Sequence, residues 1–196
     1  MKERKAGVKR ATKETKIDLA LSLDGKGSSS LSTGVGFLDH MLELLAKHAC
    51  WNLSVKAQGD LKVDDHHTME DVGICLGEAF LAALGEKSGI ARFGSASVPM
   101  EEALARVDVD LSGRAYVVYK VDFPTEKVGT FDVALTGEFL QAFARTGKFN
   151  LHVNVPYGSN SHHISEAIFK ALARALRDAV QVESEERGIP STKGVL

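Results

Sequence analysis

Cysteine is scarce in this sequence, which has only Cys50 and Cys75 among its 196 residues. Each lies in an apolar stretch and no CxxC pair occurs, so neither a disulfide framework nor a thiolate zinc site is expected. Two buried thiols in a reducing compartment fit this usage. Long apolar runs are also missing, since none approaches the roughly 18 residues that predict a membrane-spanning helix.

An excess of charge of one sign is absent as well. Lysine and arginine total 24 and aspartate and glutamate total 26, which gives a net charge of −2 at pH 7. This balance argues against bulk electrostatic binding to nucleic acid or membrane. The basic stretch MKERKAGVKRATKETK lacks an apolar segment and is not expected to be a secretory signal. We therefore expect a soluble, cytoplasmic protein.

The chain repeats itself at about half its length. SHHISEAIFKALARAL (161–176) echoes DHHTMEDVGICLGEAF (65–80), and TGEFLQAFARTGKFNLHV (136–153) echoes FLDHMLELLAKHACWNLSV (37–55). The offset is 96 residues for the histidine pairs and 98 for the upstream segment. An internal duplication follows, with half-repeats at residues 1–90 and 91–196 that share one core.

Apolar periodicity predicts the elements within each half. TKIDLALSLD (15–24) and the stretch 103–122 alternate apolar and polar residues, as half-buried strands do. Helical spacing runs through the repeated segments and continues from residue 163 to 186, before a loop-like tail. The predicted fold is α+β, with each half reading strand, strand, helix, strand, helix. Sheets are expected on one side and helices on the other.

Histidines and acids recur at the repeated positions. Both copies contain His-His-x-x-Glu, and residues i, i+3 and i+4 share a helix face. Adjacent side chains on a helix diverge by about 100°, so one pair is better suited to two metal ions than to one. The predicted ligand sets are His67, Glu70, His163 and His40 for one site, and His162, Glu166, His66 and Glu138 for the other. A crossed partition, or one shared between subunits, is an open alternative.

The ligand chemistry favours manganese or iron, with zinc as an alternative, because the set mixes imidazole and carboxylate without thiolate. A single histidine pair is more often solvated or hydrogen-bonded than metal-bound, and the duplication is what favours ligation. Glu138 is equally compatible with an acid favoured in the first turn of a helix. Asp64, Asp65 and Asp71 are candidates for capping or for supporting the ligands.

A second group of candidates is basic or hydroxylic and suits a phosphate. Lys170 is the strongest, because it lies four residues after Glu166 on the same helix face. Each of the others, taken alone, reads as an ordinary surface residue. The group comprises Arg92, Arg114, Lys170, Ser191, Thr192 and Lys193.

Several motifs together resemble the imidazoleglycerol-phosphate dehydratase family. They are GFLDHML (36–42), DDHHTMEDVGI (64–74), NSHHISEAIFKALARALRDA (160–179) and PSTKGVL (190–196), with RATKETKI and LSGR in support. The resemblance implies dehydration of imidazole glycerol phosphate to imidazole acetol phosphate in histidine biosynthesis. It also implies a ribosomal protein S5 domain 2-like fold, two Mn(2+) per active site, and trimers packed into a 24-subunit shell.

The resemblance also assigns roles to residues. Glu14 becomes the substrate-facing acid and the candidate general base. Many relatives have histidine where this chain has Glu138, so the ligand at that position is in question. The implied metal ligands are His40, His66, His67, Glu70, His162, His163 and Glu166. The implied phosphate contacts are Arg92, Arg114, Lys170, Ser191 and Lys193.

Two other readings of the motifs remain open. A dinuclear metallohydrolase acting on a phosphate ester would use the same donors and would release inorganic phosphate. A non-enzymatic assembly would use the ions only to join subunits, so that loss of Glu14 or Lys193 would have no effect.

Overall fold

The computed structural model describes residues 3–184 and 188–196 and contains two four-stranded sheets with the same topology. The first sheet has the strand order β1-β2-β4-β3 and the second has the order β5-β6-β10-β7. The first comprises β1 (Lys5–Ala11), β2 (Thr15–Ser22), β3 (Ser29–Ser32) and β4 (Asn52–Gly59). The second comprises β5 (Phe93–Met100), β6 (Ala103–Asp110), β7 (Tyr116–Lys120) and β10 (Asn150–Tyr157).

Strand directions also repeat from one sheet to the other. β2 pairs antiparallel with both β1 and β4, and β3 pairs parallel with β4. In the second sheet β6 pairs antiparallel with β5 and β10, and β7 pairs parallel with β10. The matching order and directions confirm the internal duplication predicted from the repeated sequence.

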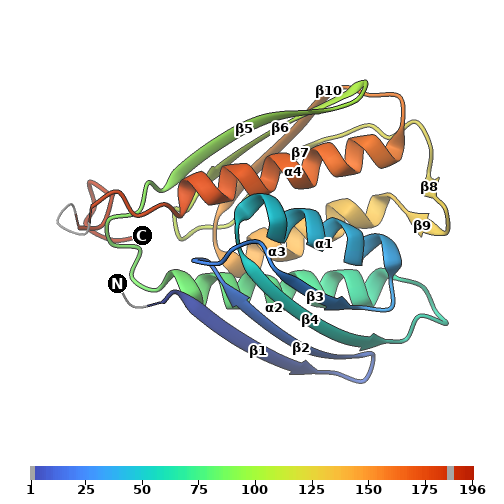
Figure 1. Cartoon of the computed structure of the whole chain (residues 1–196), viewed down its shortest axis with the longest axis horizontal. Coiled ribbons are helices and arrows are strands. Elements are labelled where there is room, and N and C mark those ends of the chain that lie inside the picture. Colours follow the sequence, from blue (N-terminus) through green and yellow to red (C-terminus); the bar gives the residue numbers. More distant parts are fainter. Residues whose placement is uncertain (1–2, 185–187) are drawn as a thin grey trace.

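The helices lie between the two sheets (Figure 1). They are α1 (Gly36–Ala49), α2 (His66–Leu84), α3 (Ala134–Gly147) and α4 (Ser161–Ala179). α2 packs on the first sheet and α4 on the second, while α2 also contacts α3 and α1 contacts α4. Each half therefore has its sheet on one side and its helices on the other, as predicted, and the halves face each other through their helices. Among the described residues no helix has the length and apolarity needed to cross a membrane.

The structure differs from the prediction in two places. Each half has three strands before its first helix where two were predicted, and β8 (Lys127–Val128) pairs with β9 (Phe131–Asp132) in a small ribbon. β7 lies within the predicted strand region 103–122. β3 escaped prediction because its four residues, SSLS, have no alternating apolar pattern. The last helix is predicted to run to residue 186 but ends at Ala179. Residues 185–187 lie outside the described part of the chain.

One apolar core joins the two halves. Trp51 and Phe80 of the first half lie 5.5 Å apart between ring centroids. Phe80 also contacts Phe143 and Phe149 of the second half, at 5.7 and 5.6 Å. All four rings are fully buried, so neither half completes its core without the other.

The two cysteines are free thiols, with Cys75 buried in this core and Cys50 half-buried. Burial raises the pKa of the Cys75 thiol to about 12, and a protonated thiol is unreactive. Cys75 therefore acts as a small apolar side chain.

Two glycines allow α2 to approach α3 closely. A Cβ on Gly77 would collide with the Thr146 hydroxyl and lie 2.6 Å from the Phe143 carbonyl oxygen. A Cβ on Gly73 would lie 2.8 Å from the Phe139 carbonyl oxygen. Both obstacles include backbone atoms, so they cannot be relieved by a change of rotamer.

We expect Gly77→Ala to destabilise the protein by about 1–3 kcal/mol, because the added methyl group overpacks this helix contact. The matched control is Gly36→Ala at the start of α1, where an added Cβ meets no atom within 4 Å. Urea unfolding of both variants would measure the difference. Equal midpoints for the two variants would contradict the close-packing argument.

Candidate metal and substrate site

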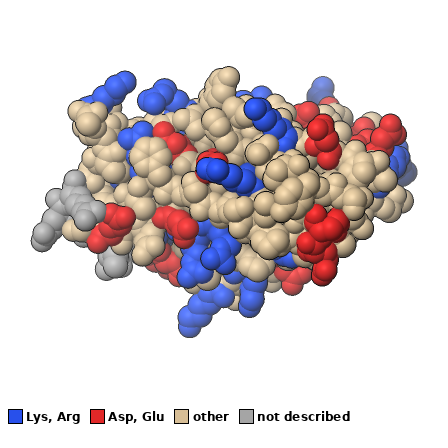
Figure 2. Space-filling view, turned by 90° about the horizontal axis from the view of Figure 1, so that it is seen from above, with Lys and Arg blue, Asp and Glu red and all other residues tan. Residues whose placement is uncertain are grey.

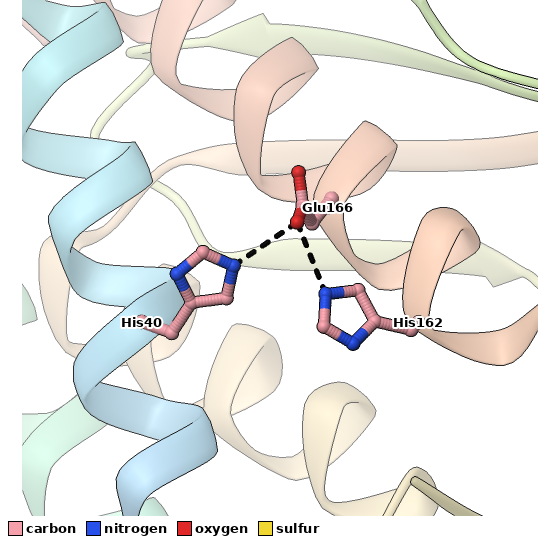
Figure 3. Close-up of side chains that lie close together, drawn as sticks. All are labelled: His40, His162 and Glu166. Carbon is pink, nitrogen blue, oxygen red and sulfur yellow. Dashed lines mark hydrogen bonds and ion pairs between the residues drawn. The ribbon is translucent and has the colours of Figure 1, made fainter.

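Two histidines from different helices converge on one buried carboxylate (Figure 3). His40 Nε2 and His162 Nε2 each lie 3.0 Å from Glu166 Oε1. The ligand atoms of these three residues all lie within 4.8 Å of one another. His40 comes from α1, and His162 and Glu166 come from the first two turns of α4. The contact between α1 and α4 thus builds a donor set that fits a divalent metal.

Glu166 is ionised although it is only 8% exposed. Burial alone would raise its pKa, but hydrogen bonds from Lys170, His40 and His162 lower the pKa to about 2. Lys170 Nζ donates to Glu166 Oε2 at 2.6 Å, which confirms the predicted shared helix face. Lys170 also lines a cavity of about 380 Å³ together with His48 and Arg174.

The equivalent motif at the start of α2 makes different contacts. His67 Nδ1 lies 3.0 Å from Asp60 Oδ2, and its Nε2 lies 3.8 Å from Glu14 Oε1. A hydrogen bond to Asp60 raises the pKa of His67, against a smaller opposing effect of burial. Glu70 Oε1 accepts a hydrogen bond from Arg145 of α3 at 3.3 Å. All of these contacts are made to the first two turns of α2.

The two rings of each histidine pair point in different directions. His66 and His67 have ring planes 88° apart, with centroids separated by 6.1 Å. His162 and His163 are 81° apart, with centroids 6.3 Å from each other. The rings of each pair thus diverge, as adjacent side chains on a helix do, and whether one pair supplies two metal sites stays a prediction.

The N-terminal turns of α2 and α4 are each held by a polar side chain that precedes the histidine pair. Asp64 Oδ1 accepts a hydrogen bond from the backbone N–H of His66 at 2.8 Å. Asn160 Oδ1 accepts from the N–H of His162 at 2.9 Å and of His163 at 3.3 Å. Asp64 therefore supports the first turn of α2, while the N-cap residue Asp65 makes no side-chain cap hydrogen bond.

The packing of the helices places His40 beside other ligands than those of its predicted ligand set. The prediction placed His40 with His67, Glu70 and His163, whereas in one chain it lies against His162 and Glu166. The reason is that α1 packs against α4 of the other half and not against α2 of its own. Glu138 is exposed on α3, which packs against α2.

Glu14 lies in the turn between β1 and β2 and is held there by a short network. Thr12 Oγ1 accepts hydrogen bonds from the backbone N–H of Glu14 at 3.1 Å and of Thr15 at 2.9 Å. The Thr15 hydroxyl donates to Asp71 Oδ2 at 2.5 Å. Asp71 is buried on α2, one turn after His67. The network therefore fixes the exposed Glu14 beside His67.

The predicted phosphate-binding residues, apart from Lys170, gather near the chain's last residues. Arg92 donates to Asp110 Oδ1 at 2.7 Å and to the Pro190 carbonyl oxygen at 2.8 Å. Gly113, beside Arg114, lies against Leu196, since a Cβ built on it would be 2.6 Å from the Leu196 carbonyl carbon. This tail lies at the end of the molecule opposite the starts of α2 and α4 (Figure 1). Within one chain, the predicted phosphate-binding residues other than Lys170 therefore lie far from the histidines.

Comparison with known proteins identifies the family. A model described as imidazoleglycerol-phosphate dehydratase matches residues 33–176. A protein of that name from Geobacillus sp. (strain WCH70) is 56% identical over 193 residues, which cover 98% of this chain and 99% of the relative. The chain belongs to the imidazoleglycerol-phosphate dehydratase family. The resemblance stated from its motifs is confirmed.

Other members of the imidazoleglycerol-phosphate dehydratase family agree in sequence and fold. The Bacillus subtilis (strain 168) relative is 54% identical over 193 residues, which cover 98% of this chain and all of the relative. The Staphylococcus aureus crystal structure matches with a TM-score of 0.83 and 40% identity over 91% of this chain and 99% of its own. The Pyrococcus furiosus structure, described as a complex with (S)-C348, has a TM-score of 0.82 at 38% identity and covers 96% and 100%. The chain is therefore an enzyme of the hydro-lyase class.

Two carboxylates near the histidines were missed by sequence reasoning. Asp60 follows β4 and Glu102 lies in the turn between β5 and β6. Acids at such positions are normally solvent-exposed, so the pattern alone gave them no weight. Glu102 Oε2 lies 2.7 Å from His163 Nδ1. Only the tertiary structure brings these acids to the histidines.

Acid unfolding should reveal the ionised state of Glu166. Because its folded-state pKa is about 2 and its ordinary value is 4.5, the stability it contributes is present above pH 4.5 and is lost as the pH falls toward 2. We expect Glu166→Gln to be less stable than the wild type at neutral pH, and this difference to shrink between about pH 5 and pH 3.

Urea unfolding of chelator-treated protein across that pH range would measure the difference. The matched control is Glu138→Gln, which removes an exposed carboxylate on α3. A constant difference between wild type and Glu166→Gln at every pH would contradict the assignment.

Proposed function

We propose that this chain dehydrates imidazole glycerol phosphate to imidazole acetol phosphate, a step of histidine biosynthesis, with manganese as its metal. The observation that carries this proposal is the donor set of His40, His162 and Glu166 in a chain of the dehydratase family. A cytoplasmic location belongs to the same proposal, because both substrate and product are soluble metabolites.

The residues available for the metal are those of the duplicated motif. His40, His162 and Glu166 are suited to hold one ion, and their imidazole and carboxylate atoms are typical ligands for manganese. His66, His67 and Glu70, with His163, are suited to hold a second ion once chains assemble. Glu138 is the remaining candidate ligand. Bound metal supplies positive charge that stabilises the negative charge developing on the substrate's imidazole ring.

Glu14 is suited to take the proton from the carbon next to the imidazole. Its carboxylate is exposed in a turn that Thr12, Thr15 and Asp71 hold in place. Its Oε1 lies only 3.8 Å from His67 Nε2, so a base at this position is next to a metal ligand. The basic residues would hold the phosphate and orient the substrate.

Turnover of imidazole glycerol phosphate by Mn(II)-loaded protein tests the function. We expect formation of the enol-derived ketone product, and we expect Glu14→Gln to lower kcat by about 10²–10⁴-fold, the usual contribution of a general base. Bound manganese should stay unchanged in that variant. Glu78→Gln, which removes an exposed carboxylate farther along α2, should retain wild-type kcat.

Two other results would contradict parts of this proposal. Release of inorganic phosphate in place of the dehydrated product would indicate a metallohydrolase. Full activity in Glu14→Gln with metal bound would leave the family assignment intact and remove Glu14 as the base.

The active site is proposed to form between chains, in trimers packed into a 24-subunit shell. Support comes from the separation within one chain, where the tail that carries Ser191, Thr192 and Lys193 lies opposite the starts of α2 and α4 (Figure 1). A substrate of a few carbon atoms cannot bridge the length of the protein. A second copy would bring its basic tail to the histidines of the first.

Mixed assemblies test whether two chains share one site. Glu14→Gln and Lys193→Ala should each be nearly inactive alone. When the two variants are dissociated, mixed equally and reassembled with Mn(II), about one site in four should draw an intact residue from each chain and recover activity. Each variant reassembled alone is the control. If mixing restores no activity although mixed assemblies form, the shared-site proposal is wrong.

A further inference from the structure

The second histidine of each pair has one ring nitrogen occupied by a carboxylate from outside its helix. Asp60 Oδ2 and Oδ1 lie 3.0 and 3.2 Å from His67 Nδ1. Glu102 Oε2 lies 2.7 Å from His163 Nδ1. The contact thus involves the same nitrogen, Nδ1, in both halves of the chain.

A carboxylate at Nδ1 determines which nitrogen carries the proton. Neutral imidazole has one N–H and one lone pair, and an ionised carboxylate can only accept a hydrogen bond. The proton of His67 and of His163 is therefore held at Nδ1, and the lone pair is left at Nε2. Metal-binding histidines are commonly oriented in this way by a carboxylate on the other nitrogen.

Backbone hydrogen bonds hold the Glu102 carboxylate and the turn that carries Asp60. Glu102 Oε1 accepts hydrogen bonds from the backbone N–H of Ser159 at 3.0 Å and of Asn160 at 2.8 Å. Glu102 thereby joins the turn between β5 and β6 to the loop that leads into α4. The Asp60 carbonyl oxygen accepts a hydrogen bond from the Val63 N–H at 2.8 Å, which closes the turn after β4. The Glu102 carboxylate is thus fixed beside its imidazole, and the Asp60 backbone is fixed in the turn that precedes His67.

The two acids come from positions that the duplication does not relate. When β4 is matched with β10, the residue that corresponds to Asp60 is Gly158. When β1 and β2 are matched with β5 and β6, the turn of Glu102 corresponds to the turn of Glu14. The same contact therefore arises from different elements, so it does not follow from the repeat alone. A shared requirement of the two histidines explains it better.

We propose that Asp60 and Glu102 are positioning residues that fix His67 and His163 with Nε2 directed toward the metal. The inference rests on the metal-dependent function proposed above and adds two residues that are not themselves ligands. It also assigns different roles to the two acids beside His67. Asp60 orients the ring through Nδ1, and Glu14, near Nε2, is available to act on the substrate.

Manganese affinity of Asp60→Asn and Glu102→Gln tests the inference. Each amide keeps the side-chain shape but can donate to Nδ1, which favours the wrong tautomer. We expect each variant to bind Mn(II) about 10–100-fold more weakly than the wild type. Electron paramagnetic resonance of free Mn(II) over the metal-depleted, assembled protein would measure this.

Controls separate positioning from simple structural support. Glu101→Gln, an exposed neighbour of Glu102 in the same turn, has the same change of charge and should bind Mn(II) like the wild type. Excess Mn(II) should restore kcat in the two test variants, and their urea midpoints in chelator should stay at the wild-type value.

The outcomes distinguish this inference from the proposed function. If the wild type binds no Mn(II), the proposed function fails. If the wild type binds Mn(II) and both test variants bind it equally well, only the positioning inference is overturned. Normal Mn(II) affinity with lowered urea midpoints would assign the two contacts to folding alone.

Discussion

Each half of this chain can bury its helices fully only against the other half. α2 and α4 cover their own sheets, but their remaining faces are closed by α3 and α1. Gly73 and Gly77 allow α2 to lie close to the α3 backbone. In α4 the position that corresponds to Gly73 is Phe169, whose ring centroid lies 5.6 Å from that of Phe139. Small residues in one copy and a large one in the other show how the duplicated halves have adapted to each other. The same packing directs the starts of α2 and α4 to one end of the molecule.

The electrostatics of the histidines follow from that arrangement. Glu166 is an ionised carboxylate in a nearly buried position because His40 and Lys170 reach it from two directions. His67 and His163 are exposed enough to receive a ligand, and acids on neighbouring turns hold them. On the face drawn in Figure 2, basic and acidic side chains are interspersed among uncharged ones.

Family membership and geometry support different parts of the functional conclusion. Identity of 56% over almost the whole chain establishes the dehydratase family. The grouping of donors indicates which residues suit a metal, and the position of the tail supports the proposal that a second chain completes the site. Manganese, the base Glu14 and the shared site are proposals that the experiments above test separately.

The sequence by itself determined the duplication, the α+β class, the helical placement of the histidine pairs and the i,i+4 contact between Glu166 and Lys170. These features are local or periodic, so they can be read from spacing along the chain. Only the tertiary structure decided that His40 meets His162, that Asp60 and Glu102 reach the second histidines, and that β3 joins its sheet. Those contacts join elements brought together by packing, and the repeat pattern does not specify which helix packs against which.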